Sequence, residues 1–429
     1  MPSGFLFRPA LVLLCLSAHL PSAARAADTD LSEMADLVLR APAGDTPLDR
    51  EIIALQKELR SVPAGSPRLE RLGWLFLAKA RAQYDDGWYR QAEQCAALLD
   101  ASHPGSPAAL LLKGQALESM HRFSQAETAA RALVARRGLA YDYGLLGDAL
   151  MEQGRLEEAR VAYQAMMDRK PGSEAYARAA HLRWLYGDAQ GACDMMALAV
   201  SAASPRDAQS LAWSYAQSGL YLFQLGRIGE ALAACDRALA LVPDHAAALA
   251  LRGRIRLSRG QARSAATDLA SAARLHPLPE IQWALADALR ACGSGAAADS
   301  VENALADGGA RKDPRSLALF LATRRRDTHT AHDLAVRERA VRGDIFTHDA
   351  LAWTAFAEGD LRTASREADS ALAPGTRDAR LFLHAGLIAR AAGDGKAARA
   401  HLSQARALAH TLLPSERKWL ENSPAIRRE

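Results

Sequence analysis

The sequence has few aromatic residues, and its apolar content comes from other side chains. Aromatic residues make up only 6% of the 429 residues, whereas 49% are hydrophobic, chiefly alanine and leucine. Small and unbranched apolar side chains suit close helix packing better than they suit sheets. The composition therefore favours an all-α fold.

The sequence also lacks a large excess of charge of either sign. The chain has 53 Lys and Arg against 49 Asp and Glu, and two of the arginines, Arg8 and Arg25, fall in a predicted leader. Without the leader the balance is 51 to 49. A protein that binds nucleic acid or an anionic membrane surface is usually strongly basic. We therefore expect a protein or peptide partner and no nucleic acid.

The sequence has no apolar run long enough to cross a membrane. The run near the start, Ala10 to Leu20, has eleven residues, whereas a spanning helix needs about twenty. Arg8 precedes this run, and Ala24-Arg25-Ala26 matches the small-x-small rule for signal cleavage. We predict that residues 1–26 are a signal peptide, that the protein is exported to the periplasm or secreted, and that no stable membrane span remains after cleavage.

Cysteine is scarce, and its spacing argues against metal sites. One of the five cysteines, Cys15, lies in the leader. The others are widely separated in the sequence: Cys95, Cys193, Cys235 and Cys292. Packed helices lie about 10 Å apart, and a disulfide needs Cα atoms within about 7 Å. Since each cysteine falls in or beside a different predicted helix, we expect buried thiols.

Motifs for catalysis are missing as well. There is no HExxH, and Gly395-Lys396 lacks both the earlier glycine and the following Ser or Thr of a phosphate-binding loop. Ser415 and Lys418 have SxxK spacing without the partner motifs of that enzyme class. We therefore predict no catalytic residues and no cofactor, and expect that the chain is not an enzyme.

A metal site is not expected either. His329 and His332 could share one helical face, but His348 is the only further histidine nearby. A zinc site needs three or four ligands held together.

What the sequence does contain is a repeat of about 34 residues. The segment that starts at Gly144 predicts an amphipathic helix, a turn centred on Gly154, a second helix and a stop at Pro171. Segments that start at Tyr215 and Leu249 have the same order.

Two markers keep one register through ten units. The residue in the middle of each first helix is small except for one leucine: Ala80, Gly114, Gly147, Ala180, Gly219, Gly253, Ala286, Leu319, Ala352 and Gly386. An alanine early in each second helix follows the same steps of 33 or 34 residues, with one step of 39: Ala92, Ala126, Ala159, Ala192, Ala231, Ala265, Ala298, Ala331, Ala364 and Ala398. Small side chains at both positions let the two helices of a unit cross closely.

Glycine and proline mark the ends of the helices. Turn glycines are expected to end the first helices: Gly87, Gly154, Gly187, Gly226, Gly260, Gly359 and Gly393. Prolines stop several second helices: Pro104, Pro171, Pro243 and Pro277. This pattern resembles the tetratricopeptide repeat family over about residues 73–412. The resemblance implies a right-handed α-solenoid of about ten helix-turn-helix repeats, with a concave face that binds partners.

Some positions depart from the pattern. His121 and Arg326 stand where turn glycines are expected, and we expect distorted units around residues 107–139 and 312–344. The 39-residue step predicts a longer connection near residues 201–206 that bends the solenoid. The expected organisation is: 1–26, signal peptide; 27–72, N-terminal capping helices; 73–203, repeats one to four; 204–412, repeats five to ten; 413–429, C-terminal capping tail.

The resemblance implies that first helices line the concave groove. Exposed positions are then expected one and four residues after each small residue, for example Arg81, Asp148 and His181. Family members that grip a carboxylate use an asparagine-containing clamp, but Asn303 and Asn422 are the only asparagines here. Candidate partner-binding residues are the larger apolar ones: Tyr84, Met151, Trp184, Leu220, Phe223, Trp353 and Phe356. These side chains either bind a partner segment or pack between successive first helices.

The sequence thus predicts an exported, non-enzymatic scaffold or assembly factor that binds a partner protein in its groove. The alternative is a recruiting or regulatory subunit of an exported enzyme or secretion complex whose catalytic chain is separate.

Overall fold

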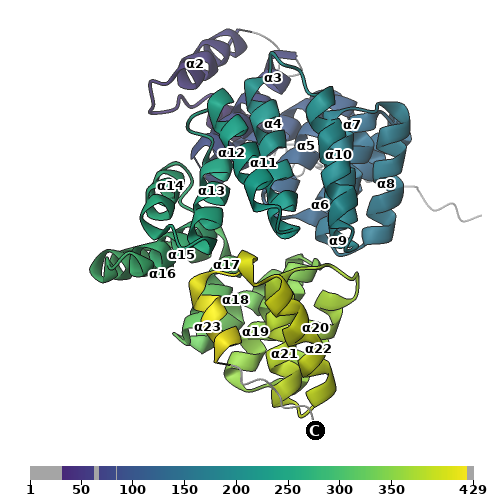
Figure 1. Cartoon of the computed structure of the whole chain (residues 1–429). Coiled ribbons are helices and arrows are strands. Elements are labelled where there is room, and N and C mark those ends of the chain that lie inside the picture. The colour runs from purple at the N-terminus through teal and green to yellow at the C-terminus, as the bar shows by residue number, and fades with distance from the viewer. Residues whose placement is uncertain (1–30, 62–66, 84, 423–429) are drawn as a thin grey trace, which may run out of the picture.

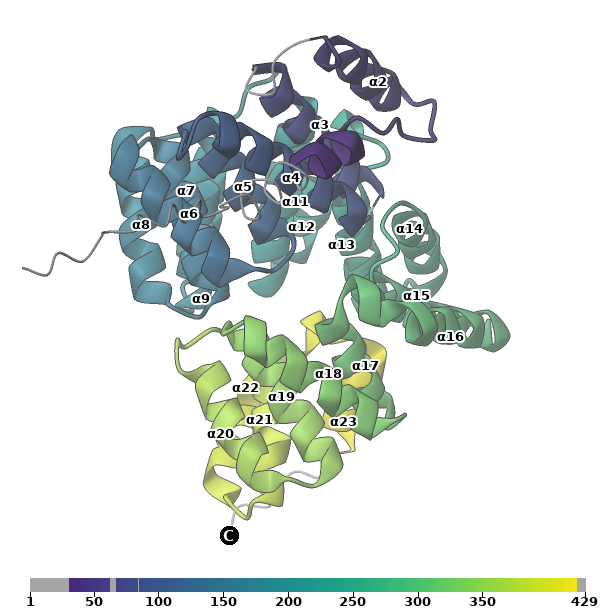
Figure 2. The same ribbon diagram turned by 180° about the vertical axis from the view of Figure 1, so that it is seen from behind.

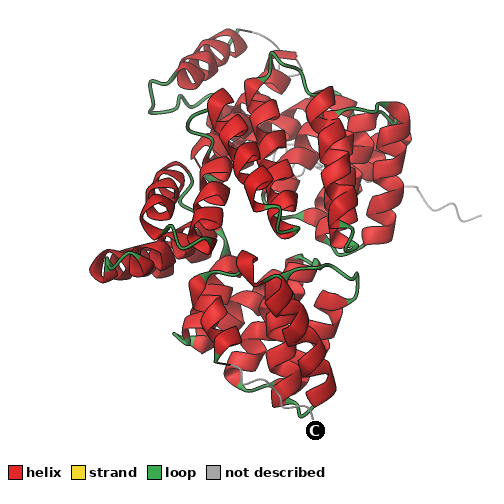
Figure 3. Ribbon diagram, in the orientation of Figure 1, coloured by secondary structure: helices red, strands yellow, loops and turns green. Residues whose placement is uncertain are grey.

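A computed structural model describes residues 31–61, 67–83 and 85–422, and these residues form helices and loops without any strand (Figure 3). The predicted signal peptide lies outside the described residues. The all-α prediction is confirmed.

Twenty of the helices form ten consecutive pairs. The first five pairs are α3 Pro67–Gln83 with α4 Asp86–Ser102, α5 Pro107–Ser119 with α6 Phe123–Arg136, α7 Ala140–Glu152 with α8 Leu156–Arg169, α9 Ser173–Leu185 with α10 Ala189–Ala202, and α11 Ala208–Gln224 with α12 Ile228–Leu241. The next five are α13 Ala246–Ser258 with α14 Ala262–Leu275, α15 Pro279–Ala291 with α16 Gly295–Lys312, α17 Pro314–Arg324 with α18 Thr328–Val341, α19 Ile345–Glu358 with α20 Leu361–Leu372, and α21 Ala379–Ala391 with α22 Gly395–Ala407. The predicted α-solenoid of ten tandem helix-turn-helix repeats is confirmed.

The two marker positions lie where the helices of a pair cross. All ten marker alanines of the second helices are fully buried. At Gly147 a Cβ atom would lie 2.3 Å from the Tyr163 ring of the paired helix α8. At Gly114 it would lie 2.4 Å from a Leu145 methyl group of α7, the first helix of the next repeat. Glycine is therefore needed at both positions because a side chain has no room.

The turns inside the repeats use left-handed backbone, mostly at glycine. Gly154 has a φ of +77°, and His121 takes the same region with a φ of +58°. Repeat eight is the distorted unit: α17 has only 11 residues, and Arg325 and Asp327 both have positive φ. The prediction that Gly87 ends a first helix is wrong, because Gly87 lies inside the first turn of α4 and does not end α3.

The 39-residue step between the markers of repeats four and five comes mainly from a longer first helix in repeat five. Helix α11 has 17 residues where α9 has 13, and the connection over 203–207 has five residues where that over 170–172 has three. Four extra helical residues and two extra loop residues account for the six-residue difference. The predicted boundary at 203/204 falls in this connection.

The N-terminal end of the array is covered by α2 (Pro47–Leu59) and a helical stretch over residues 31–38. The Gln56 side chain donates to the Val38 carbonyl at 2.8 Å. Asp49 and Lys79 form a buried ion pair that joins α2 to α3. This segment closes the apolar end of the first repeat, as a capping segment must.

The chain does not continue as an open solenoid. In both views α17–α23 form a body beside the array of α3–α12, and α13–α16 link the two (Figures 1 and 2). The contacts between the two bodies join the turns inside repeats three, four and five to the loops that follow repeats eight, nine and ten. We call this set of contacts the seam.

Backbone meets backbone along the first part of the seam. The Gly343 N–H donates to the Glu152 carbonyl at 2.9 Å. A Cβ atom on Gly154 would lie 2.1 Å from the Gly343 oxygen, and one on Gly187 would lie 2.5 Å from the Gly375 oxygen. Such an approach is possible only without side chains.

Side chains complete the seam. The Thr376 hydroxyl donates to the Leu185 carbonyl. His410 Nε2 lies 2.7 Å from the Phe223 oxygen. The Trp184 and Phe346 rings stack with centroids 5.7 Å apart. These contacts bring together segments about 160 to 190 residues apart in the chain.

The last helix, α23 (Pro414–Glu421), lies against the first helices of the later repeats. Ser415 donates from its backbone and its hydroxyl to Asp287, at 2.8 and 2.6 Å. Trp419 Nε1 donates to the Thr323 carbonyl at 3.1 Å. Asp287 and Thr323 are one and four residues after their marker positions, so α23 occupies part of the concave face of these repeats. The described part of the tail therefore caps the later repeats by folding inward.

The four cysteines outside the leader are free thiols. Cys95, Cys193 and Cys235 are buried, and Cys292 is half-buried. Burial raises the pKa of Cys235 to about 12 and that of Cys193 to about 11. The expected free thiols are confirmed, with Cys292 less buried than predicted.

Candidate functional groove

An open groove lies on the concave side of repeats one to five. It consists of two adjoining cavities of about 620 and 830 Å³. Arg81, Tyr141, Glu174 and Trp213 line both, so they mark the junction between the cavities. This junction is formed by α3, α7, α9 and α11.

Six of the eight concave positions expected from the register in the first four repeats line the smaller cavity: Arg81, Gln115, Glu118, Asp148, Met151 and His181. Of the other two, Tyr84 lies outside the described residues and Trp184 is buried. The resemblance therefore led to the correct face of these helices.

Among the groove residues that the sequence reasoning missed, four share one position in the repeat. Trp74, Tyr141, Glu174 and Trp213 stand six places before their markers and also line the groove. Positions six before and one and four after the marker are separated by seven and three residues, so they share one helical face. The missing signal was this same periodicity, extended toward the start of each helix.

Two of these residues expose large ring surfaces. Tyr141 is 51% exposed and Trp213 is 44% exposed. Lys170 lies 5.6 Å from the centre of the Tyr141 ring. The Trp213 ring has no ring or cation partner among the described residues. Exposed aromatic rings in a concave site are typical of binding surfaces.

An ion pair forms part of the groove floor. Arg178 donates to both oxygens of Asp148, at 2.9 and 2.7 Å, and the Tyr163 hydroxyl donates to the same carboxylate at 2.8 Å. The carboxylate is thus held by two side chains. This arrangement fixes α7 against α9 and α8.

The Glu118 side chain has no hydrogen-bond or ion-pair partner within the described part of the chain. Burial raises its pKa to about 7, and the nearby carboxylates of Asp148 and Glu152 add to the shift. His181 lies on the same wall, and burial lowers its pKa to about 4, so its ring is neutral at pH 7. The wall therefore presents a carboxyl group that is in no ion pair of the described residues, although the charges of Arg81 and Arg178 act on it at longer range.

The seven candidate partner-binding residues have different surroundings. Met151 lines the groove. Trp184, Phe223 and Trp353 are 6%, 1% and 1% exposed, and Leu220 and Phe356 are half-buried. Tyr84 lies outside the described residues. A role in partner binding stays a prediction for all seven.

The buried aromatic residues contact the protein's own chain. Phe346 and His410 of the seam cover Trp184 and Phe223, and Trp419 of α23 meets Trp353 with ring centroids 5.2 Å apart. These concave positions therefore pack against later segments of the same chain, as well as beside neighbouring first helices.

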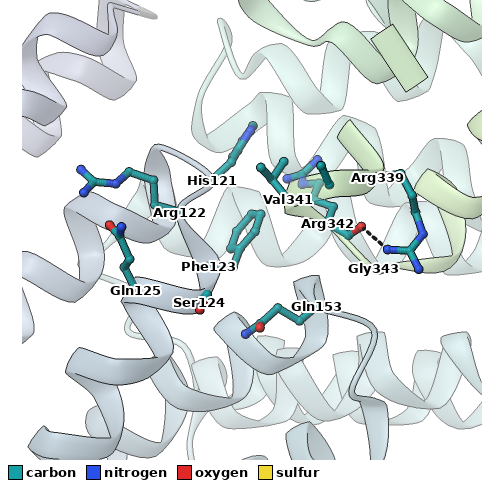
Figure 4. Close-up of a pocket in the computed structure, with 11 residues that line it drawn as sticks. His121, Arg122, Phe123, Ser124, Gln125, Gln153, Arg339, Val341, Arg342 and Gly343 are labelled. Atoms are coloured by element: carbon teal, nitrogen blue, oxygen red, sulfur yellow. Dashed lines mark hydrogen bonds between the residues drawn. The ribbon is translucent and has the colours of Figure 1, made fainter. Parts of the chain in front are cut away.

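A further cavity of about 410 Å³ lies at one end of the seam (Figure 4). Its basic side chains do not converge. Arg122 pairs with Glu93 at 2.8 Å, and Arg339 donates to the Arg342 carbonyl at 3.2 Å. Arg122 and Arg339 lie on opposite sides of the cavity in the figure, so they form no common anion site.

The histidines near residue 330 are apart and have separate neighbours. His348 Nδ1 lies 2.6 Å from Glu367, and His332 Nδ1 lies 3.5 Å from the Thr354 hydroxyl. Among the residues that the structure describes, no three His, Cys, Asp or Glu side chains are grouped to hold a metal ion. Within the same residues, no helix combines the length and apolarity needed to cross a membrane.

Comparison with solved structures gives only distant similarities. Human IFIT1, in a dimer with PPP-AAAA, is 12% identical with a TM-score of 0.47, over 88% of this chain and 94% of IFIT1. Pseudomonas aeruginosa PilF is 15% identical with a TM-score of 0.31, over 66% and 97% of the two chains. YrrB, a TPR protein with an unusual peptide-binding site, is 16% identical with a TM-score of 0.32, over 46% and 97%. At these values they carry no functional argument.

Comparison with the curated proteins gave no match. A family model described as tetratricopeptide repeat matches residues 111–174 and 217–261. The first match covers most of repeats two and three, and the second covers part of repeat five and the first helix of repeat six. Repeats of this kind are typically non-catalytic scaffolds for contacts between proteins. Within these two segments the chain is similar to the tetratricopeptide repeat family.

Proposed function

We propose that this protein is an exported, non-enzymatic scaffold or assembly factor that binds a segment of a partner protein in the groove of repeats one to five. The observation that carries the proposal is the pair of adjoining cavities with the exposed rings of Tyr141 and Trp213 at their junction. Large rings remove much apolar surface from water at a small entropic cost when a partner binds.

Export rests on the sequence of residues 1–26, and the proposed location is the periplasm or the outside of the cell. The proposal excludes nucleic acid as the partner. Carboxylates on the groove wall, such as Glu118 and Asp148, would repel a phosphate backbone.

The test compares crosslinked partners of the tagged full chain with those of a Tyr141→Ala/Trp213→Ala variant, recovered from the exported fraction. We expect partners to be lost from the double variant while its melting temperature stays unchanged. Leu198→Ala is the matched control, because Leu198 is 46% exposed on α10, a second helix. Equal capture by the double variant and the control would contradict the proposal.

A further inference from the structure

Some charged side chains of the groove are paired with each other and some are not. Four carboxylates line the smaller cavity: Glu118, Asp148, Glu152 and Glu174. Two arginines line it, Arg81 and Arg178. Arg178 is held by Asp148 in three hydrogen bonds, so its charge is used within the protein.

Three of the four carboxylates have partners. Asp148 binds Arg178, Glu152 lies 3.2 Å from the Arg342 guanidinium, and Glu174 accepts from the Tyr141 hydroxyl at 3.1 Å. Glu118 is the carboxylate that the described part of the chain leaves without a partner. A half-buried carboxylate of this kind is stabilised when a cation comes beside it.

The rings at the junction suit an apolar side chain. The Tyr141 ring already has the Lys170 ammonium group near one face. The Trp213 ring has no such neighbour among the described residues, so its exposed surface is open to apolar contact. Arginine suits the Glu118 carboxylate, because its planar guanidinium donates two parallel hydrogen bonds to such a group.

We infer that the partner segment carries an arginine whose guanidinium pairs with Glu118, and that an apolar residue beside it packs on Trp213 and Tyr141. The inference rests on the proposed function, since it names the chemistry of the segment that the groove binds. Arg81 lines both cavities and acts on Glu118 through its charge without an ion pair to it, and it disfavours a second cation at the junction.

The experiment uses the full chain and two fluorescein-labelled octapeptides, GSRWLRGS and GSEWLEGS, with binding followed by fluorescence anisotropy. We expect the arginine peptide to bind at least about tenfold more tightly than the glutamate peptide. Glu118→Gln should weaken the arginine peptide about tenfold. Asp307→Asn, which removes an exposed carboxylate of α16, should leave it unchanged. Raising the salt concentration should weaken binding.

The outcomes separate the inference from the proposed function. If both peptides bind and both lose affinity in Tyr141→Ala/Trp213→Ala, but Glu118→Gln has no effect, the groove binds peptides and the arginine inference is wrong. A tighter glutamate peptide would also overturn it. If neither peptide binds, a random peptide library displayed on phage is panned against the full chain. Groove-dependent peptides without enrichment in Arg or Lys overturn the inference alone, whereas no groove-dependent peptide overturns both. Binding of a single-stranded RNA that Glu118→Gln strengthens would likewise overturn both.

Discussion

At the residue scale, most of the fold depends on side chains that are small or absent. The marker alanines of the second helices are fully buried at every crossing, and glycines at the seam let two backbones touch. The same property has different consequences at the two places, because a crossing joins neighbours in sequence and the seam joins distant segments.

Gly154 tests the seam at one residue. Gly154→Ala should lower the stability by about 1 kcal/mol for its left-handed φ, and by about 1–3 kcal/mol more because the new methyl group meets the Gly343 oxygen. Gly359→Ala is the matched control, since Gly359 has a φ of +87° and nothing within 4 Å of a Cβ atom. Denaturant unfolding measures both. Equal losses would show that the seam contributes nothing at this point.

Glu118 should make the stability depend on pH. Its pKa is about 7 in the folded protein, above the ordinary value of 4.5, so the folded state holds a proton that the unfolded state releases between these values. The stability of the native protein should therefore fall as pH rises from about 4.5 to 7.

Glu118→Gln removes this loss because an amide does not ionise. We expect the variant to be more stable than the native protein by about 1–2 kcal/mol at pH 8, and equally stable at pH 4.5. Urea unfolding at both values checks this. A constant difference across the range would contradict the assignment to ionisation of Glu118.

Phe223 tests whether a predicted groove residue belongs to the core. It is 1% exposed and contacts His410 across the seam, so Phe223→Ala should destabilise by about 3–5 kcal/mol. Trp213→Ala should change stability by less than about 1 kcal/mol, since Trp213 is largely exposed. Thermal unfolding compares the two. Similar losses would mean that exposure does not separate core from groove.

At the scale of elements, α23 behaves as a ligand-like helix on the concave face of the later repeats. The Ser415 hydroxyl donates a hydrogen bond to Asp287, which also accepts one from Arg324 at 2.6 Å. The same hydroxyl accepts a hydrogen bond from Trp283 Nε1 at 2.9 Å. Several buried polar groups therefore depend on one hydroxyl.

Ser415→Ala should destabilise by about 1–3 kcal/mol, because it leaves the Trp283 N–H without its acceptor and Asp287 without one donor. Ser300→Ala, at an exposed position of α16, is the control and should have almost no effect. The measurement is the midpoint of chemical unfolding. No loss in Ser415→Ala would show that water replaces the hydroxyl.

The sequence register predicted the elements well and their long-range contacts poorly. Spacing of small residues located both helices of each repeat, and counting from Ala80 or Gly147 found the groove wall in the first four repeats. The seam could not be found this way, because nothing local in Gly343 or Thr376 indicates which distant turn it will meet. Trp184 and Trp353 were placed on the correct face, but their partners come from the same chain.

At the scale of the whole molecule, the seam changes how the array should unfold. In an open solenoid each repeat contacts only its neighbours, so ends unfold first. Here repeats three to five also support repeats eight to ten. Loss of the seam contacts should therefore lower the local stability of repeats three to five and of repeats eight to ten together.

A Thr376→Val/His410→Ala variant removes two side-chain contacts of the seam. Hydrogen exchange followed by mass spectrometry should show faster exchange in α7–α12 and in α17–α22, with α2–α4 unchanged. Faster exchange only next to the substituted residues would show that the two sides are independent.

The seam also restricts how many repeats this protein can have. Tandem arrays commonly gain or lose whole units, since each unit needs only the next. In this chain, three turns and three loops meet one to one across a fixed number of intervening repeats. Removal of residues 246–278, one unit between the two sides, would move every loop to the wrong turn. The length of the array is therefore part of its tertiary structure, and a change in repeat number would need a new closing surface.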